Sequence, residues 1–199
     1  MLIAMAKEHH VIIVRGLGDH RLMRSQWNFI TKLWGLFGVK VHVFTPGWAD
    51  GKSFAPKLKR LTDQVDYLTG QGFLVSLVGI SAGASAAINA YVSNRDKIHK
   101  VVFICGKIHS PDKVNARYFI ENPAFKDSLD LSTANSQKLG AIDQQKILYM
   151  HALSDMTVPP GLNKLAGVQT KAVIAFGHIL GIAVAVTFYS RTICRFLKR

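Results

Sequence analysis

The clearest chemical signal in the sequence is a serine between two glycines, in the segment Gly79-Ile80-Ser81-Ala82-Gly83. The segment fits the pattern G-x-S-x-G and stands between an apolar run typical of a buried strand and a small-residue run typical of a helix. A serine at such a sharp turn projects its hydroxyl above the sheet, where it can attack an acyl carbon. The N–H groups at the start of the helix, that of Ala82 first, would stabilise the oxyanion that forms. The pattern therefore predicts a nucleophile at Ser81.

Gly79 and Gly83 would be the glycines of this elbow, because the turn crowds the backbone on both sides of the serine. The alternative is that a helix start rich in Gly and Ala only allows close packing on the sheet. The pentapeptide alone does not decide between the two interpretations.

The elements around this turn alternate between strands and helices. Apolar runs, several of them β-branched, predict strands at 11–14, 39–44, 73–79, 101–105, 147–153 and 172–176. Bulky residues at helical spacing predict helices at 22–37, 53–69, 81–92 and 179–196. Such alternation is typical of a parallel sheet with helices on both faces. Lys40 and His42 alternate with valines in the second strand, which predicts a position near an edge of the sheet.

The segment 107–146 interrupts this alternation. It is polar and without a strand pattern, and we expect short helices that form a cap or lid over the carboxyl edge of the sheet. A length of 199 residues suits one domain, and no repeat or linker divides residues 1–199. We therefore expect a single domain with the cap as an insertion, in which Trp48, Phe119 and Phe125 are candidates for lining an acyl pocket.

The order of elements and the serine motif resemble the α/β-hydrolase family, from residue 11 to the C-terminus. The resemblance implies a shortened α/β-hydrolase fold with about six mostly parallel strands, flanked by helices and carrying a small helical cap. The chain would begin at the family's third strand. It resembles the small, esterase-like serine hydrolases of the family.

The resemblance also implies two partners for the serine, because the family places an acid and then a histidine after later strands. Asp155, just after the run 147–153, is similar to the family's acid, and His178, just after 172–176, is similar to its histidine. His178 would take the proton of Ser81 and return it to the leaving group, while Asp155 would hold the imidazole tautomer. The alternatives are an aspartate that only caps a turn and a histidine that only fills a helix start.

A second oxyanion donor is implied in the loop after the first strand. There the segment Arg15-Gly16-Leu17-Gly18 places the backbone N–H of Leu17 where the family has its donor. Arg15 stands where many members of the family have histidine, which is a departure from the pattern. The alternative is that the two glycines only make a tight turn.

The cysteines and the other histidines do not predict a second chemistry. Cys105 ends a strand at the carboxyl edge, but a thiol nucleophile is disfavoured there because it lacks the elbow. No metal and no cofactor is expected, because the remaining histidines do not stand at metal-ligand spacing. They are His9, His10, His20, His42, His99, His109 and His151. With two cysteines and no secretory signal in MLIAMAKEHH, we expect a cytoplasmic protein.

The chain is strongly basic, with 25 Lys and Arg against 12 Asp and Glu and a formal net charge of +13. Such an excess suits nucleic acid, an anionic membrane, an anionic substrate or a solvated surface. We expect no specific nucleic-acid binding, and at most weak peripheral contact with an anionic membrane that fades with salt.

Residues 172–190 contain no formally charged side chain and are bracketed by Lys171 and Arg191, so the segment has about the length of a membrane span. Gly177 and His178 interrupt it, and we favour a strand followed by a helix. The alternative is a tail-anchored membrane protein, which would remove His178 from any catalytic site.

These observations predict a serine hydrolase that cleaves a carboxylic ester, or a related thioester, amide or lactone, through an acyl-serine intermediate. The substrate would be a small-molecule acyl compound. The alternative is a non-catalytic binding module that keeps the fold and associates with an anionic surface. A chain without catalysis has no physical need for Ser81, Asp155 and His178 at three separate turns, so we favour the enzyme.

Overall fold

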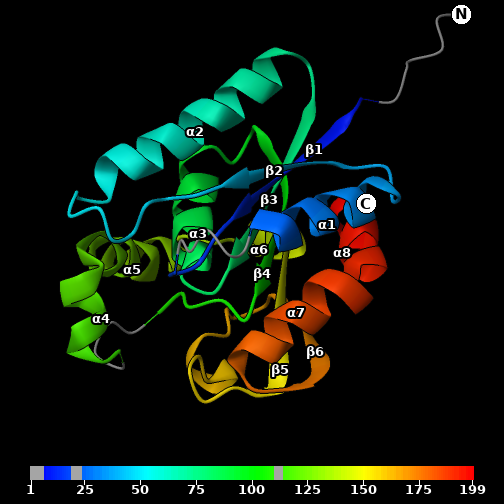
Figure 1. The fold of residues 1–199 in the computed structure, drawn as a ribbon. Coiled ribbons are helices and arrows are strands. Elements are labelled where there is room, and N and C mark those ends of the chain that lie inside the picture. Colours follow the sequence, from blue (N-terminus) through cyan, green and yellow to red (C-terminus); the bar gives the residue numbers. More distant parts are fainter. Residues whose placement is uncertain (1–6, 19–23, 110–113) are drawn as a thin grey trace, which may run out of the picture.

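The computed structural model describes residues 7–18, 24–109 and 114–199. Six strands form one sheet in the order β2-β1-β3-β4-β5-β6, and the strand pairs in this part of the chain are all parallel (Figure 1). The strands are β1 (His9–Val14), β2 (Lys40–Phe44), β3 (Leu74–Ile80), β4 (Ile98–Ile104), β5 (Ile147–Ser154) and β6 (Gln169–Phe176). The predicted fold class, a parallel sheet flanked by helices, is confirmed.

The central strands are buried on both faces, which explains why their sequences are continuous apolar runs. In β1, Ile12 packs in the core on one face of the sheet and Ile13 in the core on the other. The strands at the two edges are more exposed. β2 lies at one edge, as Lys40 and His42 predicted, and β6 lies at the other.

One face of the sheet is covered by α2 (Ala55–Gly70), α3 (Gly83–Ser93) and α5 (Pro123–Ser136) (Figure 1). α2 buries a stripe at helical spacing that includes Leu61, Val65 and Leu68. α3 is rich in alanine, and its small side chains let its backbone approach the sheet, so Ala84 and Ala87 are fully buried. The segment Gly79–Gly83 thus leads directly into the best-buried helix of this layer.

The opposite face is covered by α1 (Arg24–Gly35), α7 (His178–Phe188) and α8 (Ser190–Leu197). The Trp34 indole donates a hydrogen bond to the Val186 carbonyl (2.8 Å), which ties α1 to α7. The helix predicted over 22–37 corresponds to α1, and the first two of those positions lie outside the described residues.

The helical pattern over 179–196 forms two helices rather than one, because the chain bends by 68° at Tyr189 between α7 and α8. The Ser190 hydroxyl donates to the Thr187 carbonyl at the bend (2.6 Å). The bend lets α7 lie against β5 and β6 while α8 packs on β4 and α1.

Within the described residues, no single helix has both the length and the apolar character to cross a membrane, although the bent pair α7–α8 meets that test by length and composition alone.

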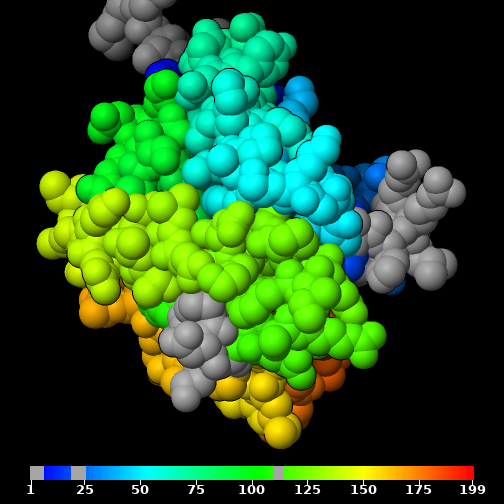
Figure 2. All heavy atoms as spheres, turned by 90° about the vertical axis from the view of Figure 1, so that its left-hand side faces the viewer, coloured from blue at the N-terminus to red at the C-terminus, as the bar shows by residue number. Residues whose placement is uncertain are grey.

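The segment 107–146 contains α4 (Ala116–Glu121), α5 and α6 (Ala141–Gln145), and its residues 110–113 lie outside the described part. α5 belongs to the core layer, because Ser128 on α5 hydrogen-bonds Ser85 on α3 through their hydroxyls (2.7 Å) and its apolar face is buried. α4 has no buried residue. Figure 2 shows the α4–α5 segment next to α2 on this face of the molecule. The sequence did not predict this division between an outer helix and a layer helix.

Candidate active site

Ser81 lies at the turn between β3 and α3, and its backbone is in the left-handed region with φ of +52°. This conformation is strained for a residue with a side chain, so the surroundings must hold it in place. The Ser81 N–H donates to the Ile104 carbonyl (3.0 Å), and the Ser81 carbonyl accepts from the Lys107 N–H (3.0 Å). The elbow predicted from the pentapeptide is therefore anchored to the end of β4.

The glycines around Ser81 are required by contact. A Cβ at Gly79 would lie 2.5 Å from the Cα of Ala84, and one at Gly83 would lie 2.1 Å from the carbonyl oxygen of Val14. Gly16, on the loop after β1, leaves room for the Ser81 side chain, because a Cβ at Gly16 would lie 2.9 Å from that of Ser81. The same glycines allow α3 to pack closely on the sheet and allow the sharp turn at Ser81. The two interpretations of the pentapeptide therefore describe the same contacts.

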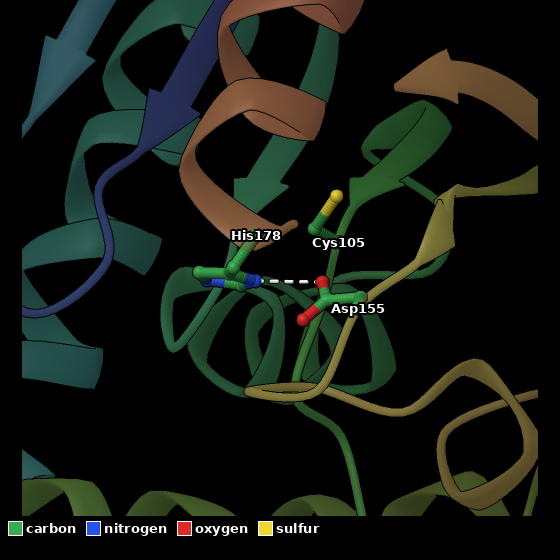
Figure 3. Close-up of side chains that lie close together, drawn as sticks. All are labelled: Cys105, Asp155 and His178. Atoms are coloured by element: carbon green, nitrogen blue, oxygen red, sulfur yellow. Dashed lines mark hydrogen bonds and ion pairs between the residues drawn. The ribbon is translucent and has the colours of Figure 1, made fainter. Parts of the chain in front are cut away.

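His178 and Asp155 meet at Ser81, although they lie 97 and 74 positions from it in the chain, as 178 − 81 and 155 − 81 give. The His178 Nε2 lies 2.8 Å from the Ser81 Oγ. The His178 Nδ1 lies 2.7 Å from an Asp155 carboxylate oxygen, the contact drawn in Figure 3. An ionised carboxylate only accepts hydrogen bonds, so Nδ1 carries the proton and Nε2 is free to accept the serine hydroxyl proton.

Both partners are held firmly. The other carboxylate oxygen of Asp155 accepts from the N–H groups of Thr157 (3.0 Å) and Val158 (2.8 Å), and its side chain is fully buried. Asp155 therefore caps the turn after β5 and also contacts the histidine. His178 is the first residue of α7, after Gly177 with φ of +88°, and its side chain is only 9% exposed.

The two predicted oxyanion donors, the N–H groups of Leu17 and Ala82, border the same cavity as Ser81. Neither donates a hydrogen bond to any other residue in the described ranges. Unpaired N–H groups beside a nucleophile can stabilise an oxyanion. Arg15, the departure from the family pattern, also lines this cavity, where its guanidinium lies over the Trp27 ring at 5.6 Å.

The catalytic-type residues open into a cavity of about 1070 Å³. Its apolar walls are Trp27 and Ile30 on α1 and Ile182 and Val186 on α7, and sequence reasoning missed these walls because they depend on how the helices pack. Of the predicted lining residues Phe125 lies there. Trp48 is instead buried against Phe54 and Phe125, and Phe119 packs on Phe125.

Lys107 is a cation in the wall of this cavity that sequence reasoning also missed, because no motif marks it. Its side chain is nearly inaccessible, with the residue only 4% exposed, and burial lowers the pKa of its ammonium group. No hydrogen bond or ion pair joins that ammonium to any of the residues described. An unpaired cation in the wall of a cavity favours an anionic group on whatever enters the cavity.

Cys105 lies beside the acid and the histidine, and one ligand-type atom from each of Cys105, Asp155 and His178 falls within 4.8 Å of the others (Figure 3). Burial raises the pKa of the Cys105 thiol to about 12, so it is neither a thiolate ligand nor a ready nucleophile near pH 7. Both imidazole nitrogens of His178 already have partners. The hydrogen-bond chain to Ser81 explains this group without a metal.

Most of the other histidines lie at the opposite end of the strands. His9 hydrogen-bonds the Ser76 hydroxyl (2.9 Å), and burial lowers its pKa to about 4. His42 hydrogen-bonds His10 (3.0 Å). His20 lies outside the described residues. These contacts give the histidines structural partners away from the cavity.

No sequence-family profile matches this chain, and no curated protein matches it by sequence. Solved structures do match. A monoacylglycerol lipase from Paleococcus ferrophilus has a TM-score of 0.67 at 17% identity, over 94% of this chain and 93% of that one. An alpha/beta hydrolase from the metagenome of lagoon sediments at Mar Chica, Morocco, has a TM-score of 0.60 at 18% identity, over 96% and 90% of the two chains. A carboxyl esterase from the fungus Tuber melanosporum has a TM-score of 0.65 at 15% identity, over 94% and 78%.

Proposed function

We propose that this chain, whose fold is that of the α/β-hydrolases, is a serine hydrolase that cleaves carboxylic esters through an acyl-serine intermediate. The observation that carries the proposal is the unbroken chain of hydrogen bonds from Ser81 through His178 to Asp155. Fold alone does not fix function, so the geometry of these three side chains bears the argument.

In the first step the Ser81 Oγ attacks the carbonyl carbon of the ester while His178 Nε2 takes the hydroxyl proton. The carbonyl oxygen becomes an oxyanion that accepts hydrogen bonds from the N–H groups of Leu17 and Ala82. Collapse of this intermediate breaks the ester bond, and His178 returns the proton to the departing alcohol. Asp155 stabilises the imidazolium throughout and stays ionised.

In the second step a water molecule attacks the acyl-serine carbonyl, and His178 takes the water proton. The second tetrahedral intermediate collapses, the acid product leaves, and the proton returns to the Ser81 oxygen. The enzyme is regenerated with no cofactor, and the net reaction adds one water across the ester bond.

The non-catalytic alternative is disfavoured by strain. A binding module has no use for a serine held at φ of +52°, a conformation that costs of order 1–3 kcal/mol. The structural neighbours named as a lipase and an esterase support the same choice. A cavity of about 1070 Å³ with apolar walls suits a small-molecule acyl compound.

Lys107 would give this hydrolase a preference for esters with an anionic group. We expect Lys107→Met to lower kcat/KM for the mono-nitrophenyl ester of adipic acid by about tenfold to a hundredfold, the range for one charged hydrogen bond. Nitrophenyl hexanoate, which has the same acyl length without the carboxylate, should change less than about twofold. The kcat/KM value for each ester is measured from initial rates.

Lys107→Arg is the matched variant, because it keeps the charge, and it should retain most of the preference. If Lys107→Met lowered kcat/KM equally for both esters, Lys107 would have a general structural role. That result would contradict the proposed preference for esters with an anionic group.

The experiment that tests the proposed function is labelling with a fluorophosphonate, which reacts covalently with activated serines. The intact protein should be labelled, and Ser81→Ala should not, because Ser81 combines a hydrogen-bonded base with the N–H groups of Leu17 and Ala82 at the cavity. Ser93→Ala is the control, since Ser93 lies at the end of the same helix with its hydroxyl bonded to the Asn89 carbonyl. Labelling is measured by in-gel fluorescence.

An intact protein that stays unlabelled would overturn the proposal. Labelling that persists in Ser81→Ala would place the nucleophile elsewhere.

A further inference from the structure

The two helical layers of the molecule differ in charge. From Met156 to Arg199 the chain contains no Asp or Glu, and neither does α1. The carboxylates of the described residues lie mainly on or beside α2, α3, α4, α5 and α6. They are Asp50, Asp63, Asp66, Asp96, Glu121, Asp127, Asp130 and Asp143, with Glu8 before β1 and Asp155 buried in the site. The layer of α1, α7 and α8, named the basic layer below, thus has only positive side chains among its charged groups.

The cations of the basic layer gather on α8. Arg191, Arg195, Lys198 and Arg199 line a groove of about 430 Å³ beside Phe37. None of these side chains forms an ion pair with a carboxylate of the described residues, whereas lysines of the other layer are paired, as Lys59 is with Asp63. The cluster is therefore free to attract anions.

The same layer exposes large apolar side chains. Phe188, at the end of α7, is 84% exposed, and Ile179 and Leu180 are exposed one and two positions after the histidine. Phe176, the last residue of β6, is exposed directly before the turn that leads into α7. Several large apolar side chains exposed on one helix and at its approach are typical of a site of interaction with another body.

We propose that the basic layer docks on the surface of an anionic lipid bilayer. The exposed side chains of α7 and β6 would enter the boundary between headgroups and acyl chains, and the α8 cations would contact the anionic headgroups. A second copy of this chain fits less well, because it would place cations against cations. Nucleic acid would pair with the cations but leave the apolar side chains in water.

Docking in this orientation would also bring the catalytic cavity to the lipid. Trp27, Phe29 and Ile30 of α1 and Ile182 and Val186 of α7 form the cavity walls, and both helices belong to the basic layer. An acyl chain leaving the bilayer would therefore enter between apolar walls on its way to the nucleophile. This step rests on the proposed function, whereas the docking itself does not.

The test is flotation of the full-length chain with vesicles, using the Ser81→Ala variant so that lipid hydrolysis plays no part. Vesicles of phosphatidylcholine alone are compared with vesicles in which about one third of the lipid is phosphatidylglycerol. We expect binding to the anionic vesicles that falls with added salt, and little binding to the neutral ones. No binding to the anionic vesicles would overturn the proposal.

Two pairs of substitutions locate the docking face. Arg191→Gln with Arg195→Gln should lower the partition onto anionic vesicles about tenfold or more, and Phe176→Ser with Phe188→Ser should do the same. Lys59→Gln with Lys126→Gln removes the same charge from the other layer, and Tyr67→Ser removes an exposed ring there. These controls should change binding less than about twofold, because their residues face away from the lipid.

If the control variants lost as much binding to anionic vesicles as the basic-layer variants, net charge alone would drive binding. That result would reject the basic layer as the docking face. Self-association in sedimentation velocity that Phe176→Ser with Phe188→Ser abolishes, without vesicle binding, would replace the lipid by a second copy. Fluorophosphonate labelling is done without lipid and tests the proposed hydrolase alone. A failure of the docking proposal can therefore be told apart from a failure of the proposed function.

Discussion

His178→Ala is expected to lower kcat for a short-chain nitrophenyl ester by about a thousandfold or more. In such a proton-transfer unit, removing one member costs about as much activity as removing all of them. Without the imidazole, the Ser81 hydroxyl has no base within hydrogen-bond distance, whereas the intact site places His178 Nε2 at 2.8 Å. Residual activity would come from the cavity and the oxyanion donors alone. The rate is measured as release of nitrophenolate at saturating ester.

The matched control is His151→Ala. His151 is also half-buried and lies on β5, but its Nδ1 contacts the Ala152 carbonyl rather than the nucleophile. Its substitution should leave kcat within about threefold. A His178→Ala protein that folds and retains its turnover would reject His178 as the base, and with it the mechanism above.

The sharp backbone turn at Ser81 was predictable from sequence because its determinants are local. Gly79, Ser81 and Gly83 stand within one turn, and the steric demands of that turn hold whatever the rest of the chain does. Asp155 and His178 were placed by resemblance and by their positions after two strands, since the carboxyl ends of parallel strands meet at one edge of the sheet. The structure places their side chains together there.

What sequence could not predict depends on packing between distant elements. The bend at Tyr189 follows from where α7 and α8 find apolar surface, and the apolar pattern of residues 179–196 does not mark it. α5 appeared polar enough to be part of a cap, yet Ser128 and Asn135 are satisfied by hydrogen bonds to α3 and are buried. Lys107 carries no motif, and its place in the cavity wall depends on the loop after β4.

The proposed catalytic site and the charge of the basic layer are linked through α7. The helix begins with His178, which hydrogen-bonds Ser81, and it ends with Phe188, which is exposed directly before the bend into α8. A helix that needed only to hold the histidine would gain nothing from an exposed phenylalanine at its far end. The proposed bilayer contact gives that exposure a physical reason.

Gly83→Ala is expected to lower the free energy of unfolding by about 4 kcal/mol or more, which is among the largest effects of single substitutions. The new Cβ would lie 2.1 Å from the Val14 carbonyl oxygen and 2.8 Å from that of Arg15, and both are backbone atoms that cannot rotate away. Either α3 or the end of β1 must move. The gain of about 1 kcal/mol in helix propensity is too small to offset this clash. Urea titration followed by circular dichroism measures the change.

Gly70→Ala is the matched control, because Gly70 ends α2 and a Cβ there meets nothing within 4 Å. That variant should be unchanged or more stable by about 0.5–1 kcal/mol. Since a typical domain has only about 5–15 kcal/mol of stability, Gly83→Ala is expected to unfold at much lower urea concentration or to be recovered only in aggregates. A Gly83→Ala protein with the urea midpoint of the intact chain would contradict the close approach of α3 to β1. It would then remove the steric reason for a glycine at position 83.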